Sequence, residues 1–316
     1  MGRDILRVAA DSTPGVVVVT VDNPPHQLVD AVFFGALVRL LDRLDADRGV
    51  RAVVWESADP DFFLMHGDVA ALTRVPAGER PAPERPNVAA AALDRLRRAR
   101  YVTVGALDGA ARGGGAEFLT ALDLRYGTAR SVIGWPEVAL GILPGSGATA
   151  RLPHVLGRAR TLDILLTGRD VRAEEAYALG WLQDVVEAGE LAGRVRAVAR
   201  RIAAMPPASV AAVKQVVEVA GRDPGAALLA ETRALDALMG AGAHLAPMAA
   251  FLAAGGQTRE AEADPERWAS VLDAVVRAGA DIRAGADGGG TGAVSAPDPA
   301  TAAGPAPDGG PAPAGA

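Results

Sequence analysis

Residues 101–117, with the sequence YVTVGALDGAARGGGAE, decide the fold expected of this chain. Tyr101–Leu107 is an apolar and β-branched run, which predicts a buried strand. Gly113-Gly114-Gly115 predicts a tight turn that opens a helix from about Ala116, with Glu117 in its first turn. No side chain covers the backbone N–H groups of such glycines, and the helix dipole adds positive potential there. The turn therefore suits a negatively charged oxygen.

A second acidic residue follows at a fixed distance. Glu137 lies 20 residues after Glu117, behind another predicted strand, in a Pro-Glu corner among apolar neighbours. A carboxylate in apolar surroundings has a raised pKa, which suits general acid–base catalysis near neutral pH. Gly67, in an earlier loop, could supply a second N–H donor to an oxyanion hole. From the residues alone, a structural interpretation stays open, in which Glu117 is a charge stabilised by the helix dipole and Glu137 an exposed loop acid.

The rest of the ordered chain alternates strands with helices. Ile5–Ala10 and Val16–Val21, separated by a turn-forming segment, predict a hairpin. Helical spacing of apolar residues predicts a helix over 30–46. Further expected elements are a strand at 50–56, a helix at 88–98, a strand near 124–127 and helices from 149 onward. Such alternation implies mainly parallel β-structure with helical crossovers.

Composition divides the chain and excludes several classes. We expect a core domain over residues 1–204, an Ala-rich helical region over 205–282, and a disordered tail rich in Gly, Ala and Pro over 283–316. The net charge of −6 disfavours nucleic acid as a partner, and the absence of cysteine excludes disulfides and thiolate nucleophiles. With no apolar run near the ~20 residues of a membrane helix and no secretory signal, we expect a cytoplasmic protein without membrane contact.

Four segments in fixed order and spacing carry a family resemblance. They are Asn23-Pro24-Pro25, Asp61–Asp68, Gly113–Glu117, and Trp135–Gly141 continuing into Pro144–Gly147. Together with Arg151-Leu152-Pro153, Leu156-Gly157, Leu166–Arg169 and Ala173–Leu182, they resemble the crotonase (enoyl-CoA hydratase/isomerase) superfamily from about Ile5 to about Leu252. The resemblance implies an α/β crotonase (ClpP/crotonase-like) fold. This is a spiral of ββα repeats with a C-terminal helical region that forms a homotrimer or a dimer of trimers.

The resemblance also assigns roles to residues. It places the oxyanion-hole N–H groups on Gly67 and Gly114 and the acid–base pair on Glu117 and Glu137. Keeping both glutamates favours hydration of a 2-enoyl-CoA, with coenzyme A entering as part of the acyl-CoA thioester substrate and with no permanently bound cofactor or metal. The remaining residues implied in substrate or CoA binding are Met65, His66, Asp68, Gly113, Trp135, Pro136 and Gly145.

This chain departs from the family pattern at three places. Met65 and His66 stand where the family has small residues, and His66 is either a pH-sensitive functional group or, as we favour, a satisfied and partly buried side chain. Arg112 replaces an apolar residue and is either a rim charge or a partner for a phosphate or an acidic acyl tail. The final helix, Met248–Ala254, lacks the Lys or Arg after Phe-Leu that the family often has near CoA, and Ala253-Ala254-Gly255-Gly256 stands there instead. Apart from these departures, Pro144–Gly147 lacks the Lys of a nucleotide-binding loop, so we expect it to shape the acyl pocket.

Two other functions compete with the hydratase. One is an enoyl-CoA isomerase or another thioester enzyme of the same superfamily that relies on a single glutamate. The other is a crotonase-fold protein that binds a ligand without turnover, for which the Met65-His66 loop is the main support. Glu117→Gln distinguishes a hydratase from an isomerase, because the substitution should lower hydration by orders of magnitude and affect an isomerase that relies on Glu137 much less.

Overall fold

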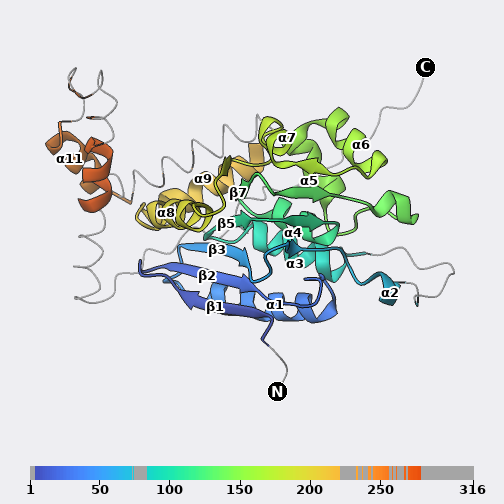
Figure 1. Ribbon diagram of the computed structural model, residues 1–316. Coiled ribbons are helices and arrows are strands. Elements are labelled where there is room, and N and C mark those ends of the chain that lie inside the picture. Colours follow the sequence, from blue (N-terminus) through green and yellow to red (C-terminus); the bar gives the residue numbers. More distant parts are fainter. Residues whose placement is uncertain are drawn as a thin grey trace, which may run out of the picture.

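The computed structural model describes residues 4–72, 74 and 84–220, and in the C-terminal part residues 233, 237, 241–242, 245–255, 258, 261, 267 and 270–278. Two β-sheets, one of six strands and one of four, run through this part and are surrounded by helices (Figure 1). Within it, six of the eight strand pairings are parallel. The predicted mixed α/β class is confirmed.

The larger sheet begins with the predicted hairpin. β1 (Leu6–Ala10) pairs antiparallel with β2 (Val16–Val21). Four parallel strands complete the order β1-β2-β3-β5-β7-β10: β3 (Ala52–Ser57), β5 (Val102–Leu107), β7 (Leu124–Thr128) and β10 (Asp184–Val186). The strands predicted at 50–56, 101–107 and 124–127 are thus present, with ends that differ by at most two residues.

The smaller sheet explains the repeat. Its order is β4-β6-β8-β9, made of β4 (Phe62–Leu64), β6 (Ala110–Arg112), β8 (Val132–Gly134) and β9 (Val171–Arg172). In each of the pairs β3–β4, β5–β6 and β7–β8, the first strand joins the larger sheet and the second joins the smaller one. A helical segment follows each pair, and this is the predicted spiral of ββα repeats.

Those helical segments follow the strand pairs in chain order. They are α2 (Val69–Leu72) and α3 (Val88–Arg97) after β4, α4 (Gly114–Ala121) after β6, and the 3-10 helix η1 (Glu137–Leu140) with α5 (Ala148–Leu156) after β8. Later in the chain come α6 (Arg158–Thr167), α7 (Ala173–Ala178) and α8 (Leu191–Ala203). Strands of only two or three residues show no periodicity, which is why the sequence did not predict those of the smaller sheet.

Both faces of the larger sheet are covered, so its central strands are apolar on both sides. On β3, Ala52 and Val54 belong to a core cluster that includes the buried side of α8. The alternate residues, Val53 and Trp55, belong to the larger core on the opposite face, together with α1 (Ala31–Ala46), α3 and α4. Helix α1 begins where predicted, since Asp30 caps it by accepting a hydrogen bond from the Phe33 backbone N–H at 2.8 Å.

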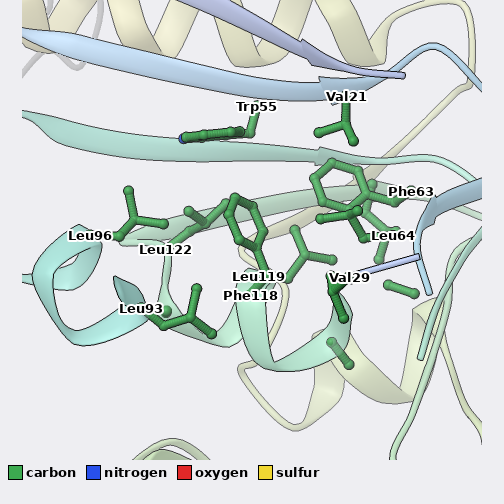
Figure 2. Close-up of a cluster of buried hydrophobic side chains, with 14 of the residues drawn as sticks. Val21, Val29, Trp55, Phe63, Leu64, Leu93, Leu96, Phe118, Leu119 and Leu122 are labelled. Carbon is green, nitrogen blue, oxygen red and sulfur yellow. The ribbon is translucent and has the colours of Figure 1, made fainter. Parts of the chain in front are cut away.

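Phe118 of α4 is the centre of the larger core. Its ring packs edge-to-face against Trp55 of β3, with centroids 4.9 Å apart, and against Phe33 of α1 at 5.8 Å. Phe63 of β4 is the fourth ring, at 6.3 Å. Figure 2 shows these apolar side chains filling the space between the strands and the helices α3 and α4. Phe118 therefore connects α4 to both sheets.

Most of the described residues after 206 lie in helices. α9 (Pro207–Ala220) docks on the core through Lys214, whose Nζ contacts Asp123 at 2.8 Å, and through Glu218, which pairs with Arg97. α11 (Leu245–Ala253) lies apart from the two sheets (Figure 1). The boundary after residue 204 stays a prediction, and the tail at 283–316 lies outside the described residues. None of the described helices is both long and apolar enough to span a membrane.

The aromatic centre generates a stability prediction. Phe118→Ala removes a fully buried ring that touches three others, so we expect the free energy of unfolding to fall by about 3–5 kcal/mol. The matched control is Val88→Ala, at a side chain that is 70% exposed, which should change it by less than about 0.5 kcal/mol. Urea unfolding followed by circular dichroism measures both, and equal midpoints for the two variants would contradict this account of the core.

Candidate active site

The turn between β6 and α4 is the base of the site. Gly113 has a φ of +54°, which is strained for any side chain, and its N–H donates to the Gly134 carbonyl of β8 at 2.8 Å. Helix α4 starts at Gly114, two residues earlier than predicted, so two glycines form its first positions. Glu117 lies in the first turn, as predicted, and its N–H donates to the Gly113 carbonyl at 2.9 Å.

The two glycines after Gly113 admit other segments into close contact. A Cβ atom on Gly114 would fall against the Val29 side chain, and one on Gly115 would fall against the backbone carbonyl of Leu64. The Gly115 N–H also donates to the Met65 carbonyl at 3.0 Å. Only glycine lets the helix start pack this tightly against the loop after β4.

That loop brings Gly67 next to Gly114. It is fixed by hydrogen bonds from the Met65 N–H to the Gln27 carbonyl at 2.8 Å and from the Val29 N–H to the His66 carbonyl at 3.3 Å. The Gly67 nitrogen lies 4.0 Å from the point where a Cβ of Gly114 would be. Neither glycine N–H has an acceptor in the described part of the chain. Both predicted oxyanion donors are therefore adjacent and available to a ligand oxygen.

Glu117 is a buried carboxylate held by backbone donors. Its side chain is 2% exposed, and Oε1 accepts hydrogen bonds from the N–H groups of Ser146 at 2.7 Å and Ala148 at 2.9 Å. Burial raises the pKa of Glu117, while these two donors and the charge of Arg151 act in the opposite direction. The donors fix the position of the carboxylate at the start of α5.

Glu137 is buried as well, and the backbone donor that acts on its pKa is its own N–H. It is the first residue of η1 and is 8% exposed, and no hydrogen-bond partner for Oε2 is found among the described residues. Burial raises the pKa of Glu137 to about 7, against the hydrogen bond from its own N–H, and the negative charge of Glu117 acts in the same direction as burial. The interpretation of Glu137 as an exposed loop acid is excluded by this burial.

Gly113 lies between Glu137 and the loop that carries Gly67. A Cβ atom on Gly113 would lie 2.7 Å from Glu137 Oε1 and 2.9 Å from the Cβ atom of His66. The half-buried His66 ring has its Nδ1 2.8 Å from the Gly67 carbonyl oxygen, so an Nδ1–H donates there. His66 is thus a satisfied, partly buried side chain, which is the alternative that the sequence favoured.

The other predicted binding residues lie in different surroundings. Met65 and Pro136 are half-buried, and Asp68 caps α2 by accepting from the Ala71 N–H at 3.0 Å. Trp135 is fully buried and packs edge-to-face on Trp181, with centroids 6.5 Å apart. Trp135 therefore supports the site from within the core.

Gly145 lies in the loop before α5, and Arg112 is the last residue of β6. Gly145 is exposed, and its carbonyl accepts from the Asn87 side chain at 2.8 Å. The Arg112 guanidinium binds both carboxylate oxygens of Asp170, at 2.9 and 2.6 Å. Arg112 is thus a partly exposed charge that is paired within the chain.

Sequence reasoning missed the donors to Glu117. Ser146 and Ala148 act through backbone N–H groups, which no residue type reveals, and the loop was expected only to shape the acyl pocket. The available signal was glycine: Gly147 has a φ of +119° and directly precedes α5, so the loop exposes N–H groups at a helix start. Across the described chain, no three His, Asp or Glu side chains gather as metal ligands.

Comparison with known proteins identifies relatives of this chain. The chain is 35% identical over 178 residues to the fatty acid oxidation complex subunit alpha of Shewanella loihica, which covers 54% of this chain and 25% of that protein. It is 33% identical over 199 residues to the glyoxysomal fatty acid beta-oxidation multifunctional protein MFP-a of Cucumis sativus, covering 62% and 26%. The chain thus spans about a quarter of the length of these curated relatives.

A solved structure and a family profile complete the comparison. The structure resembles that of an enoyl-CoA hydratase from Bacillus anthracis, with a TM-score of 0.71 and 23% identity over 78% of this chain and 95% of that one. The expected crotonase fold is therefore confirmed. The profile of the enoyl-CoA hydratase/isomerase family matches residues 11–239. The chain belongs to the enoyl-CoA hydratase/isomerase family, whose members act on CoA thioesters.

Proposed function

We propose that the protein is an enoyl-CoA hydratase that adds water across the 2,3 double bond of a 2-enoyl-CoA thioester. One observation carries this proposal: two buried carboxylates, Glu117 and Glu137, interact electrostatically beside two backbone N–H groups that have no acceptor among the described residues. Hydration needs one group to take a proton from water and another to deliver a proton to carbon, so a pair of carboxyl groups matches the reaction.

The N–H groups of Gly67 and Gly114 stabilise the intermediate in this mechanism. When water adds to C3, electrons move through the double bond onto the thioester oxygen and form an enolate. The two N–H groups donate to that oxygen, and the N-terminus of α4 adds its positive potential. Val29 packs against Gly114, and backbone hydrogen bonds of Met65 and His66 fix the loop before Gly67, so the donors need little reorganisation during the reaction.

The different surroundings of the two glutamates assign their roles. Glu117 is the base, since its two backbone donors and Arg151 favour the ionised form that accepts a proton from water. Glu137 is the acid, since a carboxyl group with a pKa of about 7 is partly protonated near neutral pH and can donate to C2. The product is a 3-hydroxyacyl-CoA, and solvent exchange restores the two protonation states.

The substrate enters with its own coenzyme A, so the mechanism uses no permanently bound cofactor. We assign substrate contact to the half-buried Met65, His66 and Pro136 and to the exposed Gly145, because all four lie in the segments around the two glutamates. Both curated relatives carry fatty acid oxidation in their names, which favours a fatty acyl chain. Trp135, being fully buried, acts by supporting Pro136 and Glu137.

Replacing each glutamate tests the acid–base pair. Glu117→Gln and Glu137→Gln keep the side-chain shape but remove the ionisable group, so each should lower kcat for hydration by about 100-fold or more. The measurement is the loss of the conjugated thioester absorbance with crotonyl-CoA and with a longer 2-enoyl-CoA. Glu175→Gln, which alters a surface ion pair with Arg169, is the matched control and should stay within about twofold of the wild type.

The same variants separate the competing functions. An isomerase that depends on Glu137 alone would convert a 3-enoyl-CoA, and Glu117→Gln would leave most of that activity intact. A binding protein without turnover would bind acyl-CoA and show no absorbance change with any variant. Either result would contradict the hydratase proposal.

The pKa of Glu137 generates a prediction about pH. As the acid, Glu137 must be protonated in the free enzyme, so kcat/KM should fall about tenfold per pH unit above about pH 7.

Thermal unfolding provides an independent measurement of the same pKa. Because the folded pKa lies above the ordinary value of 4.5, the stabilising contribution of the neutral carboxyl group is lost as pH rises through about 7. Glu137→Gln should therefore exceed the wild type in Tm at pH 8, and by less at pH 5; a pH-independent difference would refute this.

We propose further that the chain forms a homotrimer or a dimer of trimers. α11 lies apart from the sheets and exposes Leu245, Met248 and Leu252 by 53–64%, which favours a protein partner on that helix (Figure 1). Light scattering should give three or six times the 32.2 kDa of one chain, and Leu252→Lys should shift the population toward single chains. A wild-type mass of one chain would rule the assembly out.

A further inference from the structure

We propose that Arg151 is a positioning residue, whose guanidinium holds the loop 145–148 so that its two N–H donors keep Glu117 in place. The inference rests on the proposed role of Glu117 as the base. Arg151 donates from Nη1 to the Ser146 carbonyl oxygen at 2.8 Å, and the Ser146 N–H in turn donates to Glu117 at 2.7 Å. A single residue thus joins the guanidinium to the carboxylate.

Close packing against Gly147 fixes the guanidinium in the loop. A Cβ atom on Gly147 would lie 2.7 Å from Arg151 Cζ, so the flat group rests directly on the glycine backbone. The φ of Gly147, +119°, is rarely adopted by residues with side chains. The Arg151 N–H also donates to the Gly147 carbonyl at 3.0 Å, which anchors the same loop to α5. Ser146 and Ala148, the two donors to Glu117, flank this contact.

The position of Arg151 is unfavourable for stability alone. A cation in the first turn of a helix faces the positive end of the dipole, and Arg151 is only 7% exposed there. Burial and next the charge of Arg97 lower the pKa of Arg151. The acids that act on it in the favourable sense come from three helices: Asp94 of α3, Glu117 of α4 and Glu218 of α9. A buried arginine held among these charges is consistent with a role in the site.

The charge of Arg151 has a second consequence for Glu117. It lowers the pKa of that carboxyl group, against the larger effect of burial. Arg151 therefore both fixes the position of the base and favours its ionised form. Its loss should change kcat and the pH dependence of the reaction, while the affinity for the thioester, which depends on other segments, should change little.

Kinetics of two substitutions test the inference. Arg151→Gln should lower kcat for hydration of crotonyl-CoA by about 10- to 100-fold with KM changed by less than about threefold. The acidic limb of its kcat/KM profile should move to higher pH, because Glu117 loses a stabilising charge. Arg151→Lys keeps the charge, so it should restore the position of that limb and part of kcat. Arg112→Gln, which breaks the exposed pair with Asp170, is the matched control and should leave the acidic limb unmoved.

A double-mutant cycle on urea unfolding tests the contact between Arg151 and the Glu117 loop without measuring enzyme activity. The urea midpoints of Arg151→Gln, Glu117→Gln and the double variant should be non-additive, since both residues bind the same loop. Gly147→Ala, which displaces the guanidinium without touching its charge, should lower kcat as Arg151→Gln does.

The outcomes distinguish the two proposals. If the urea midpoints show coupling between Arg151 and Glu117 but the wild-type protein hydrates no enoyl-CoA, the hydratase proposal is overturned and the positioning contact stands. Additive midpoints, or an Arg151→Gln variant with wild-type kcat and pH profile, would overturn the inference about Arg151.

Discussion

The close approach of three chain segments at Gly113-Gly114-Gly115 is the constraint on which the site depends. Each glycine faces a different neighbour: Glu137 and His66 at the first, Val29 at the second, and the Leu64 backbone at the third. A methyl group at any of these positions would separate the start of α4 from the segment that it contacts. The start of α4, the N–H groups of Gly67 and Gly114 and both glutamates lie close together because no side chain intervenes there.

The carboxyl groups of Glu117 and Glu137 lie in the same site but have different hydrogen-bond partners. Both are buried, and desolvation raises the pKa of each. Glu117 accepts two hydrogen bonds from N–H groups at the start of α5, whereas Glu137 lies at the start of a short 3-10 helix, where its own N–H is the backbone donor that acts on its pKa. Backbone geometry, and not residue type, therefore gives the two carboxyl groups different surroundings.

The elements that the sequence predicted correctly are those with a long periodic pattern of apolar residues. Long apolar runs such as Val102–Leu107 and the capped helix after Asp30 were predictable from periodicity. The strands of the smaller sheet were not, since two or three residues carry no period. The family resemblance singled out Glu117 and Glu137, but the burial of Glu137 and the pairing of Arg112 with Asp170 arise from tertiary contacts between distant segments.

The fold tolerates these buried charges because α4 serves the core and the site at once. Every residue of this helix is buried, and Phe118, adjacent to Glu117, packs among three aromatic rings from α1, β3 and β4. Desolvated carboxylates and a buried Arg151 weaken the folded state, so they require surroundings that cannot relax around them. The aromatic contacts supply that rigidity one residue away from Glu117. A loosened Phe118 would therefore disturb the pKa values of the site as well as the stability of the core.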